Sequence, residues 1–402
     1  MTLKRLRLRN LLFHWRGNLA VFLGVVAGTA VLTGALLVGD SLRGSLRDRT
    51  LHQLGWVEEA LIAPRFFRQS LAGDLARAGA AERVCPVLLL QGTMVVRARG
   101  TSGAIRRQIS GVTVLGVESS FWTAFGENRT PSEGERVVLN SALGQRLEVT
   151  VGETVALRLQ KPSAIPRETL LGRRDDKSIL DEWPVTVDEV LDAADPADAF
   201  SLRPELEAPR TVFVPLEALQ QRLGLPKRCN AILAGDVRSP LAELLRSHLQ
   251  LADWWLTLQG PQERVEGLFQ RLDKNRDGQL QPREWRERLA ASLVEAVHPG
   301  RNPTLTREEV DQFYRLNRNY LSLESTQLLL EPYLAEAALE AAKEAHLQAA
   351  PTLLYLANGI RAGDSEIPYS LVAALDPGLP PPLGPFLPPG VSQLADDEIV
   401  LA

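Results

Sequence analysis

Residues 1–41 read MTLKRLRLRNLLFHWRGNLAVFLGVVAGTAVLTGALLVGDS, and this stretch decides how the rest of the chain is placed. No charged residue lies between Gly17 and Gly39. This length matches the roughly 20 apolar residues that cross about 30 Å of hydrocarbon. We therefore predict a transmembrane helix over residues 17–39.

The charges that flank this segment predict its orientation. Residues 1–16 carry only basic charges, whereas residues 40–49 carry both signs. The positive-inside rule then places residues 1–16 in the cytoplasm, as a basic amphipathic segment at the inner membrane surface, and the chain after residue 40 outside. A cleaved signal peptide is disfavoured because the apolar segment exceeds the usual 7–15 residues. A buried core helix is disfavoured by the one-sided basic flank.

Composition and motifs exclude several classes of protein. The chain has 402 residues, 45% of them hydrophobic, and a formal net charge of −4, which gives no electrostatic reason to expect nucleic-acid binding. It contains no P-loop, no nucleophile elbow and no HExxH motif, so we expect no catalysis. Cys85 and Cys229 are equally consistent with a disulfide and with two buried thiols.

The segments that follow the anchor predict an α+β fold. RVCPVLLLQGTMVVRARG and AIRRQISGVTVLGVE are typical of two strands around a hairpin tip at Gly100 to Gly103. Val155, Leu157 and Leu159 alternate as one buried sheet face requires. Strands alternate irregularly with short helices, which favours a mixed sheet. Residues 332–347 are typical of a helix, and TLLYLANGI and EIPYSLVAAL of two strands.

Residues 273–284, DKNRDGQLQPRE, have the spacing of a calcium-binding EF-hand loop. Six oxygen donors at this spacing surround one point, and Gly278 permits the sharp turn between them. Glu284 closes the site as a bidentate ligand, while Gln279 offers its backbone carbonyl. The predicted Ca²⁺ ligands are Asp273, Asn275, Asp277, Gln279, Gln281 and Glu284.

The flanks of this loop favour the same interpretation. Before the loop, Val265, Leu268, Phe269 and Leu272 fall on one helical face. Cationic residues within the loop, and a degenerate second loop over 298–309 that lacks acidic ligands at its start, predict weak binding. The alternative is a polar helix–turn–helix that binds no metal.

Strand-like pieces at 254–259 and 320–324 bracket this helical module, which predicts an insertion into a host domain. The expected organisation is then an anchor, an interrupted core domain and an inserted all-α module. The expected boundaries are 1–16, 17–39, 40–260 for the first part of the core domain, 261–317 for the EF-hand, and 318–402 for its return part with a proline-rich segment at 376–390.

The chain resembles the N-terminal part of an FtsX-like (MacB-type) ABC-transporter permease. The resemblance rests on the anchor running into LLVGDSLRGSLR, and then on VTVLGVESSFW, RVVLNSALGQRLEVTVGETVALRL, FSLRPELEAPRTVFVPLEALQQRLG and YLANGIRAGDSEIPYSLVAAL in this order. The terminal LADDEIVL completes the series and resembles the earlier ERVVLN.

This resemblance implies a bacterial-type cytoplasmic (inner) membrane protein with its bulk outside. It implies a non-catalytic role in which a separate ABC ATPase subunit and further permease helices are partners, for export or for handling lipoproteins or lipids. A homodimer is compatible with this interpretation. The EF-hand and the single apolar span depart from the family pattern, so the chain is interpreted as a piece of a longer permease.

Two other hypotheses remain open. One is a stand-alone membrane-anchored protein for calcium binding or adhesion, with the EF-hand as its functional centre. The other is an anchored hydrolase, for which residues 175–198 offer abundant carboxylates, although an acidic stretch is more often a solvated loop.

Overall fold

A computed structural model of the chain describes most of its residues. The described residues are 3–97, 105–127, 129, 134–160, 180–203, 207–285, 294, 297, 304–327, 330–363, 365–381, 383–395 and 398–400. They form two compact units, which we describe separately: residues up to Leu249 belong to the first and residues from Gln250 onward to the second. The expected hairpin tip at Gly100 to Gly103 lies outside the described residues.

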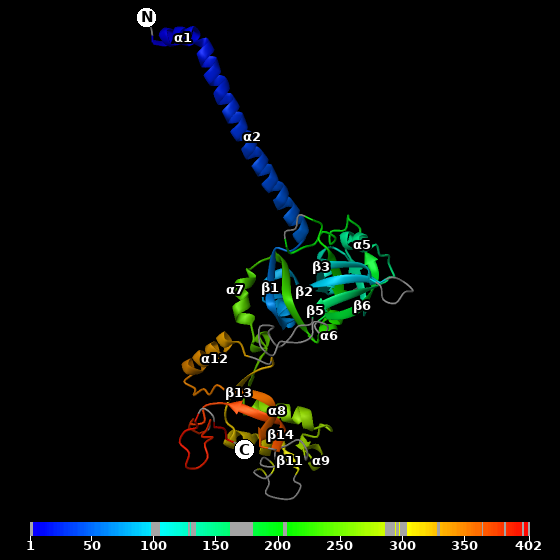
Figure 1. Cartoon of the computed structure of the whole chain (residues 1–402), viewed down its shortest axis with the longest axis vertical. Helices are drawn as coiled ribbons and strands as arrows, with labels where there is room; N and C mark the ends of the chain where they lie inside the picture. The colour runs from blue at the N-terminus through cyan, green and yellow to red at the C-terminus, as the bar shows by residue number, and fades with distance from the viewer. Residues whose placement is uncertain are drawn as a thin grey trace. The chain divides into compact units, whose positions relative to one another are not determined.

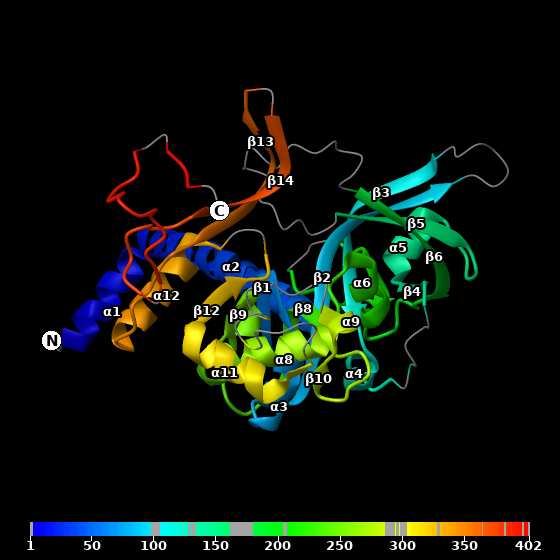
Figure 2. The ribbon, with the colours of Figure 1, turned by 90° about the horizontal axis from the view of Figure 1, so that it is seen from below.

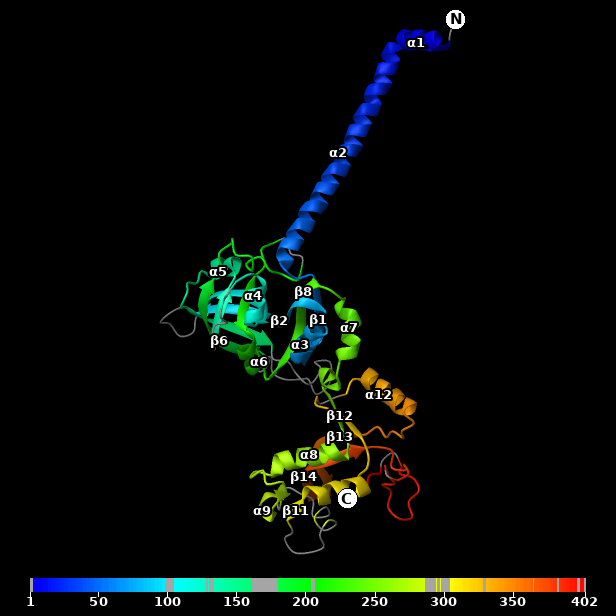
Figure 3. The same cartoon turned by 180° about the vertical axis from the view of Figure 1, so that it is seen from behind.

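The chain begins with two helices, α1 (Leu3–Phe13) and α2 (Trp15–Leu54). The predicted transmembrane segment lies inside α2, and within the described part of the chain α2 is the helix long and apolar enough to cross a membrane. The helix axis turns between α1 and α2 (Figures 1 and 3). His14 separates the two helices, and across it the Asn18 side chain donates a hydrogen bond of 3.2 Å to the Leu11 carbonyl.

The short helix α1 differs from the expected amphipathic segment. At about 100° per residue, Leu6 and Phe13 share one side of the helix, but Leu11 and Leu12 lie about 140° and 240° around from Leu6, so the four do not form one stripe. The leucines alternate with arginines, and an alternating pattern cannot produce one apolar face at helical period.

An eight-stranded mixed sheet forms the body of the first unit. Its strand order is β1-β8-β2-β3-β7-β4-β6-β5, and β2 also pairs with β5, so six of the strands close on themselves. The long strand β2 makes this closure, because it pairs with β8 along its first half and with β3 and β5 along its second. The strands are β1 (Glu59–Arg68), β2 (Ala81–Arg97), β3 (Ile105–Val117), β4 (Arg136–Leu139), β5 (Thr154–Gln160), β6 (Leu180–Val190), β7 (Thr211–Pro215) and β8 (Arg228–Val237).

Alternating apolar residues explain why these segments form strands of one sheet. Val155, Leu157 and Leu159 are all almost completely buried, which confirms the predicted sheet face of β5. Gly92 lies where β2 meets β5, and a Cβ there would stand 3.1 Å from the Arg158 carbonyl oxygen. Glycine thus permits the close approach that closes the sheet.

Among the described residues of the first unit, five short helices accompany the sheet. Four of them connect consecutive strands of the chain, among them α3 (Ser70–Arg77) between β1 and β2 and α6 (Leu216–Leu223) between β7 and β8. The others are α4 (Ser119–Ala124), α5 (Ser141–Leu147) and α7 (Leu241–His248). The buried faces of α3 and α7 share one apolar cluster with Cys229 and Ile232 of β8.

The second unit contains small two-stranded sheets and helices. The 3-10 helix η3 (Leu251–Trp254) leads into β9 (Leu256–Gln259), which pairs antiparallel with β12 (Ser322–Ser325). Between them lie α8 (Pro261–Leu272), β10 (Gln279–Leu280), α9 (Pro282–Trp285), β11 (Leu305–Thr306) and α11 (Arg307–Asn317). After β12 come α12 (Pro332–Glu344) and the hairpin of β13 (Leu353–Ala362) and β14 (Ser365–Ala374), visible as a separate ribbon in Figure 2.

The grouping of these elements differs from the expected domain organisation. The sequence predicts that residues 318–402 return to the core domain. Among the described residues, however, β12 pairs with β9 and β14 pairs with β13, and neither joins the eight-stranded sheet. Each strand finds its partner nearby in the same unit, so residues 318–400 group with the helical module that precedes them.

Candidate functional site

The stalk helix α2 enters the first unit through a joint at its carboxyl end. Gly55 follows the last residue of α2, has φ +58° and donates its N–H to the Leu51 carbonyl at 3.1 Å. A Cβ on Gly55 would stand 2.7 Å from Cε1 of Phe125. Both the backbone conformation and the close approach therefore require glycine at this position.

An aromatic cluster receives the chain directly after Gly55. Trp56 contacts Phe121 and Phe125 edge-on, with ring centroids 6.4 and 6.3 Å apart. Phe121 is fully buried and also packs against Phe200, at 5.3 Å between centroids. Edge-to-face pairs of this kind add roughly 0.5–1.5 kcal/mol beyond the area they bury. The cluster fixes the end of the stalk to α4 and to the loop after β6.

Polar contacts reinforce the same joint. The Gln53 carbonyl of α2 accepts a hydrogen bond of 2.9 Å from the N–H of Ser201, and the Gln53 side chain is buried. Three residues earlier in that loop, Asp198 accepts from the backbone N–H of Ser141 at 2.5 Å and from its hydroxyl at 2.7 Å. The loop therefore bridges the stalk and the start of α5.

Asn140 completes this connection from inside the core. Its side-chain nitrogen donates to the carbonyls of Asp198 and Pro209, at 3.1 and 2.6 Å. Its side-chain oxygen accepts from the N–H groups of Leu143 and Thr211, at 3.2 and 3.0 Å. A fully buried amide with every group satisfied orders its surroundings, since leaving any one unpaired would be costly.

A small hollow of about 230 Å³ lies beside the joint. It holds both signs of charge, Arg49 from α2 and Asp198 from the loop after β6. Its lining comes from the end of α2 and from the loops around residues 198 and 208: Arg49, His52, Gln53, Asp198, Ala199, Ala208 and Pro209.

An ion-pair cluster contacts Trp122, which packs edge-on against Phe121 of the aromatic cluster. The guanidinium of Arg129 lies over the Trp122 ring, 5.1 Å from its centroid, and pairs with Glu127, Glu189 and Asp195 at 2.6, 3.2 and 2.5 Å. Burial, and then the charge of Asp195, raises the pKa of Glu127. The single guanidinium of Arg129 therefore links the segments that carry the three carboxylates, which gives these acidic residues a structural role.

The acidic loop of the second unit lies between α8 and α9, and its side chains bond to its own backbone. Asp273 accepts from the N–H groups of Asp277 and Gly278, at 3.2 and 2.9 Å. Asp277 accepts from the Gln279 N–H at 2.8 Å and from the side chains of Asn275 and Gln281 at 2.8 and 3.2 Å. Positive φ values at Arg276 and Gly278 turn the chain.

Glu284 holds the far end of the same loop. One carboxylate oxygen accepts from the N–H of Gln281 at 2.9 Å, and the other from the N–H of Lys274 at 3.3 Å. The predicted donors thus belong to one loop, but their carboxylates do not converge. In the part of the chain that the structure describes, no three side chains of His, Cys, Asp or Glu gather closely enough to hold a metal ion.

The apolar flanks of the loop form a core of their own. The predicted α8 face of Val265, Leu268, Phe269 and Leu272 is buried, as expected. The end of the loop pairs with the second, degenerate segment, because β10 and β11 are antiparallel with Leu280 opposite Leu305. Residues 298–303 of that second segment lie outside the described residues.

The two cysteines do not form a disulfide. Cys85 lies opposite Leu233 on the β2–β8 ladder, whereas Cys229 lies opposite Phe67 on the β1–β8 ladder, and both are free and buried. Burial raises the pKa of the Cys85 thiol to about 11. Of the two alternatives left open by the sequence, the structure selects buried thiols.

Sequence reasoning found the acidic loop but missed the joint. The only local signal at the joint is the glycine–tryptophan pair at 55–56, which directly follows a long helical pattern. The partners Phe121, Asp198 and Ser201 lie far along the chain, and nothing in their spacing relates them to α2.

Comparisons with known proteins identify the first unit. The profile of the family described as "MacB-like periplasmic core domain" matches residues 19–239, more than half of the chain. No curated protein sequence matches the chain. Within this match lie most of the apolar helix α2, the joint and the whole eight-stranded sheet.

Two solved structures show likeness at low identity. The periplasmic region of MacB from Actinobacillus actinomycetemcomitans shares 13% identity, with a TM-score of 0.30, over 50% of this chain and 85% of that chain. The extracellular domain of the ABC-type transporter YknZ from Gram-positive bacteria shares 13% identity, with a TM-score of 0.28, over 47% and 87%. By the match over residues 19–239, the chain belongs to the MacB-like periplasmic core domain family.

Proposed function

We propose that this chain is the extracytoplasmic portion of an ABC-transporter permease, with its N-terminus in the cytoplasm. Its role is to pass movement of membrane helices, driven by a separate ATPase subunit, to a domain outside the membrane. The processes served are export or the handling of lipoproteins or lipids. Family membership and the apolar helix support the membrane location, and the basic flank supports the orientation.

The observation that carries this proposal is the continuity of α2 from the apolar segment to the joint. α2 spans 40 residues, and at 1.5 Å per residue it is roughly 60 Å long. About 30 Å suffices to cross the hydrocarbon. The 15 residues of α2 after Gly39, roughly 22 Å of helix, therefore extend beyond the predicted span as a lever. The aromatic cluster and the Gln53–Ser201 hydrogen bond fix the lever to the core.

Calcium binding by the acidic loop is the finer part of the proposal. Asp273, Asn275, Asp277 and Glu284 offer hard side-chain oxygens, and Gln279 and Gln281 supply further donors, which is the set that calcium prefers. Carboxylate oxygens carry more lone pairs than the loop amides use. The buried Glu284 joins the loop to α9, so an ion held there would fix the angle between the flanking helices.

A structural role suits this site better than a signalling role. Lys274, Arg276 and Arg283 offset the loop carboxylates, which predicts weak affinity. Extracellular calcium modules work at dissociation constants of roughly 10⁻⁴–10⁻³ M. Outside the cell such a site stays almost fully occupied by calcium. It would therefore stabilise the conformation of the module rather than respond to changes in calcium concentration.

Orientation is tested by a reporter enzyme that is active only outside the cytoplasm, fused after residue 402. Activity of this fusion supports the proposal, and activity of a cytoplasm-only reporter at the same position contradicts it. The matched control replaces the basic residues before Gly17 with glutamine. Loss of the charge asymmetry should reduce the fraction of correctly oriented chains.

Rigid coupling is tested by distance measurements between spin labels on Ser45→Cys of the stalk and Glu82→Cys of the core, both exposed positions. The native cysteines are buried, and the raised pKa of Cys85 keeps its thiol protonated and unreactive. We expect one narrow distance distribution in the full chain. A broad distribution would show that α2 swivels freely and cannot transmit force.

A further inference from the structure

The basic charges that precede the predicted span lie on α1 and at the start of α2. Arg5, Arg7 and Arg9 belong to α1, Arg16 is the second residue of α2, and all four are exposed. Asp40 is the first acidic residue of the chain, and roughly 36 Å of α2 separate it from Arg16. No acidic neighbour along these helices therefore neutralises the four arginines.

The turn between α1 and α2 lies at the edge of the predicted span. The span begins at Gly17, directly after Trp15 and Arg16, and tryptophan is enriched at the level of the lipid headgroups. The Arg16 guanidinium lies 5.7 Å from the centroid of the Trp15 ring. Because the helix axis turns there (Figure 1), α1 does not continue the line of the span, and its 11 residues, roughly 16 Å of helix, would stay close to the headgroups.

On α1 the arginines flank a short apolar line. Leu6 and Phe13 share one side of the helix, and both side chains are exposed. At about 100° per residue, Arg5 and Arg9 lie about 100° and 60° from Leu6 in one direction around the helix. Arg7 lies about 100° from Leu6 in the other direction. A helix that turns Leu6 and Phe13 toward the hydrocarbon therefore extends arginines to both sides, along the plane of the headgroups.

These directions decide between two sources of phosphate. Guanidinium groups on opposite flanks of a helix cannot converge on one small anion, whereas a layer of phospholipids offers each of them a separate phosphate. Arginine pairs with phosphate through two parallel hydrogen bonds, and such charge-assisted contacts are stronger than neutral ones. A cluster of basic residues beside a transmembrane helix is typical of binding to anionic lipids. The arrangement on α1 therefore fits a lipid surface better than a free phosphate ion.

The opposite end of the span carries arginines without this bias. Residues 40–49 contain Arg43, Arg47 and Arg49, but also Asp40 and Asp48, and Arg43 lies 3.9 Å from Asp40. The acidic residues repel an anionic surface and offset the arginines beside them. Of the two ends of the span, only the one that carries α1 should attract anionic lipid.

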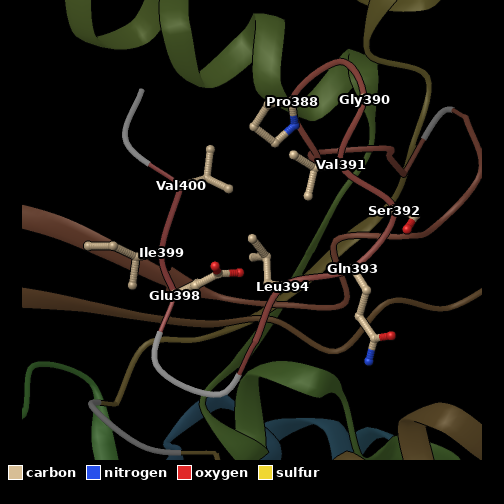
Figure 4. Close-up of a pocket in the computed structure, with 9 residues that line it drawn as sticks. All are labelled: Pro388, Gly390, Val391, Ser392, Gln393, Leu394, Glu398, Ile399 and Val400. Atoms are coloured by element: carbon tan, nitrogen blue, oxygen red, sulfur yellow. The ribbon is translucent and has the colours of Figure 1, made fainter.

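An exposed apolar region of the second unit carries the opposite charge. An open hollow of about 710 Å³ is lined by apolar side chains such as Val391, Leu394 and Ile399, and the charged residue of its lining is Glu398 (Figure 4). A carboxylate beside apolar side chains disfavours contact with an anionic membrane. On α1, by contrast, exposed apolar side chains and arginines coincide.

We propose that α1 binds anionic phospholipid headgroups through Arg5, Arg7 and Arg9, with Leu6 and Phe13 at the boundary of the acyl chains. The proposal rests on the proposed crossing of the membrane by α2 and adds a lipid class that this chain recognises. A zwitterionic surface has no net negative charge, so α1 should dock there weakly. A docked α1 would fix one end of α2 at the membrane surface, while the joint fixes the other end to the core.

The test uses the full chain with a spin label on Asn10→Cys, reconstituted in nanodiscs of phosphatidylcholine alone or mixed in equal parts with phosphatidylglycerol. Asn10 is exposed and lies about 40° from Leu6 around the helix, so docking removes the label from water. The native cysteines are buried. We expect a neutral, water-soluble nickel chelate to reach the label freely on the zwitterionic discs, and at least about threefold less often on the anionic discs.

Three double variants locate the contact. Arg5→Gln with Arg7→Gln removes one arginine from each flank and should shift the docking equilibrium on anionic discs by about 30-fold toward the free helix. Glutamine is nearly as good a helix former as arginine, so α1 should stay folded. Arg5→Lys with Arg7→Lys keeps both charges and should stay within about threefold of the parent chain. Arg43→Gln with Arg47→Gln, on the other side of the span, is the matched control and should leave the shielding of the label unchanged.

Free phosphate and salt identify the source of the contact. Inorganic phosphate added at constant ionic strength should not release α1, because the arginines on its two flanks bind separate lipids. Raising the ionic strength should release it, because the Debye length falls from about 30 Å at 0.01 M to about 3 Å at 1 M.

The outcome is separable from the proposed orientation. Nanodiscs expose both faces of the membrane to solution, so the shielding of the label does not depend on which side α1 occupies in the cell, and the reporter fusion tests that side. A chain whose α2 did not cross the membrane would fail to enter the discs, which would overturn the crossing and this proposal together.

Three further results would overturn the proposal alone. The first is equal accessibility of the label on zwitterionic and anionic discs. The second is equal shielding in the parent chain and in Arg5→Gln with Arg7→Gln, because apolar contact alone would then hold α1. The third is release by inorganic phosphate at constant ionic strength, because the arginines would then form a site for a soluble anion.

Discussion

The stalk joint and the acidic loop are held in opposite ways. At the joint, Trp56, Phe121 and their neighbours pack ring against ring, and the buried amide of Asn140 has all its hydrogen bonds satisfied inside the protein. In the loop, the carboxylates of Asp273, Asp277 and Glu284 accept hydrogen bonds from backbone N–H groups of the same turn.

This difference separates a region held by apolar packing from one held by local hydrogen bonds. The joint depends on burial, which operates without any ion and is nearly independent of calcium and of salt. The carboxylates of the loop have more lone pairs than their amide partners use, and calcium binding to them stays a prediction. We therefore expect perturbations of the two regions to act on separate unfolding transitions.

The largest effect should come from Phe121→Ala. Removing a fully buried ring leaves a cavity between Trp56, Phe125 and Phe200 and should lower the free energy of unfolding of the first unit by about 3–5 kcal/mol. Urea unfolding followed by tryptophan fluorescence measures this change. The exposed Val151→Ala should change it by less than about 0.5 kcal/mol. If Phe121→Ala lowered the free energy of unfolding by as little as Val151→Ala, the aromatic cluster would not be what stabilises the joint.

Glu284→Gln should act on the second unit alone. At free calcium about 100 times the dissociation constant, an intact site adds about 2.7 kcal/mol of stability, and this variant should lose most of that gain. Titration calorimetry and melting with and without calcium measure both quantities. Gln281→Ala is the matched control and should weaken binding only modestly. Equal calorimetric traces for all three proteins would contradict the assignment of ligands.

Gly55→Ala sharpens the account of the joint. Alanine at φ +58° is strained, and its Cβ would press on Phe125, so we expect a loss of about 1–3 kcal/mol in the first unit. Gly73→Ala is the control: it lies within α3 with no atom near its Cβ, and should stabilise by about 0.5–1 kcal/mol. A neutral Gly55→Ala would show that the joint is loose.

The smallest expected effect is a dependence on pH through Glu182. Hydrogen bonds from Arg97, and also from Arg158, lower the pKa of Glu182. Since the folded pKa lies below the unfolded value of about 4.3, the stabilisation is present above that value and disappears as the pH falls through the folded pKa. The pairs are partly exposed, so Glu182→Gln should cost less than about 1 kcal/mol at neutral pH. The measurement is the free energy of unfolding of the parent and of Glu182→Gln between pH 5 and pH 3. If both lose the same amount of stability over this range, Glu182 makes no such contribution.

The sequence predicts features that depend on neighbours along the chain. The length of the apolar segment and the charges on either side of it predict α2. Apolar residues at every second position predict the buried face of β5, and apolar residues at helical spacing predict the buried face of α8. The EF-hand spacing located six residues that the structure places on one loop, although calcium binding by them stays a prediction.

The remaining features depend on contacts between distant segments. The closure of the sheet through β2–β5 pairing and the packing of Phe200 and Ser201 against the end of α2 leave no periodic pattern in the sequence. The strand-like pieces that bracket the helical module predict that the strands after residue 318 return to the core domain. In the structure, β12 pairs with β9 and β14 pairs with β13, so these strands belong to the second unit. The amino-acid composition of a strand does not specify its pairing partner.

The central claim is that calcium stabilises the second unit while the joint and its sheet need no ion. Differential scanning calorimetry of the full chain in detergent, with millimolar calcium and with a chelator, tests it most directly. We predict two transitions, of which only that of the second unit rises in temperature with calcium. Two transitions that both ignore calcium, or a single transition that shifts as a whole, would contradict the claim.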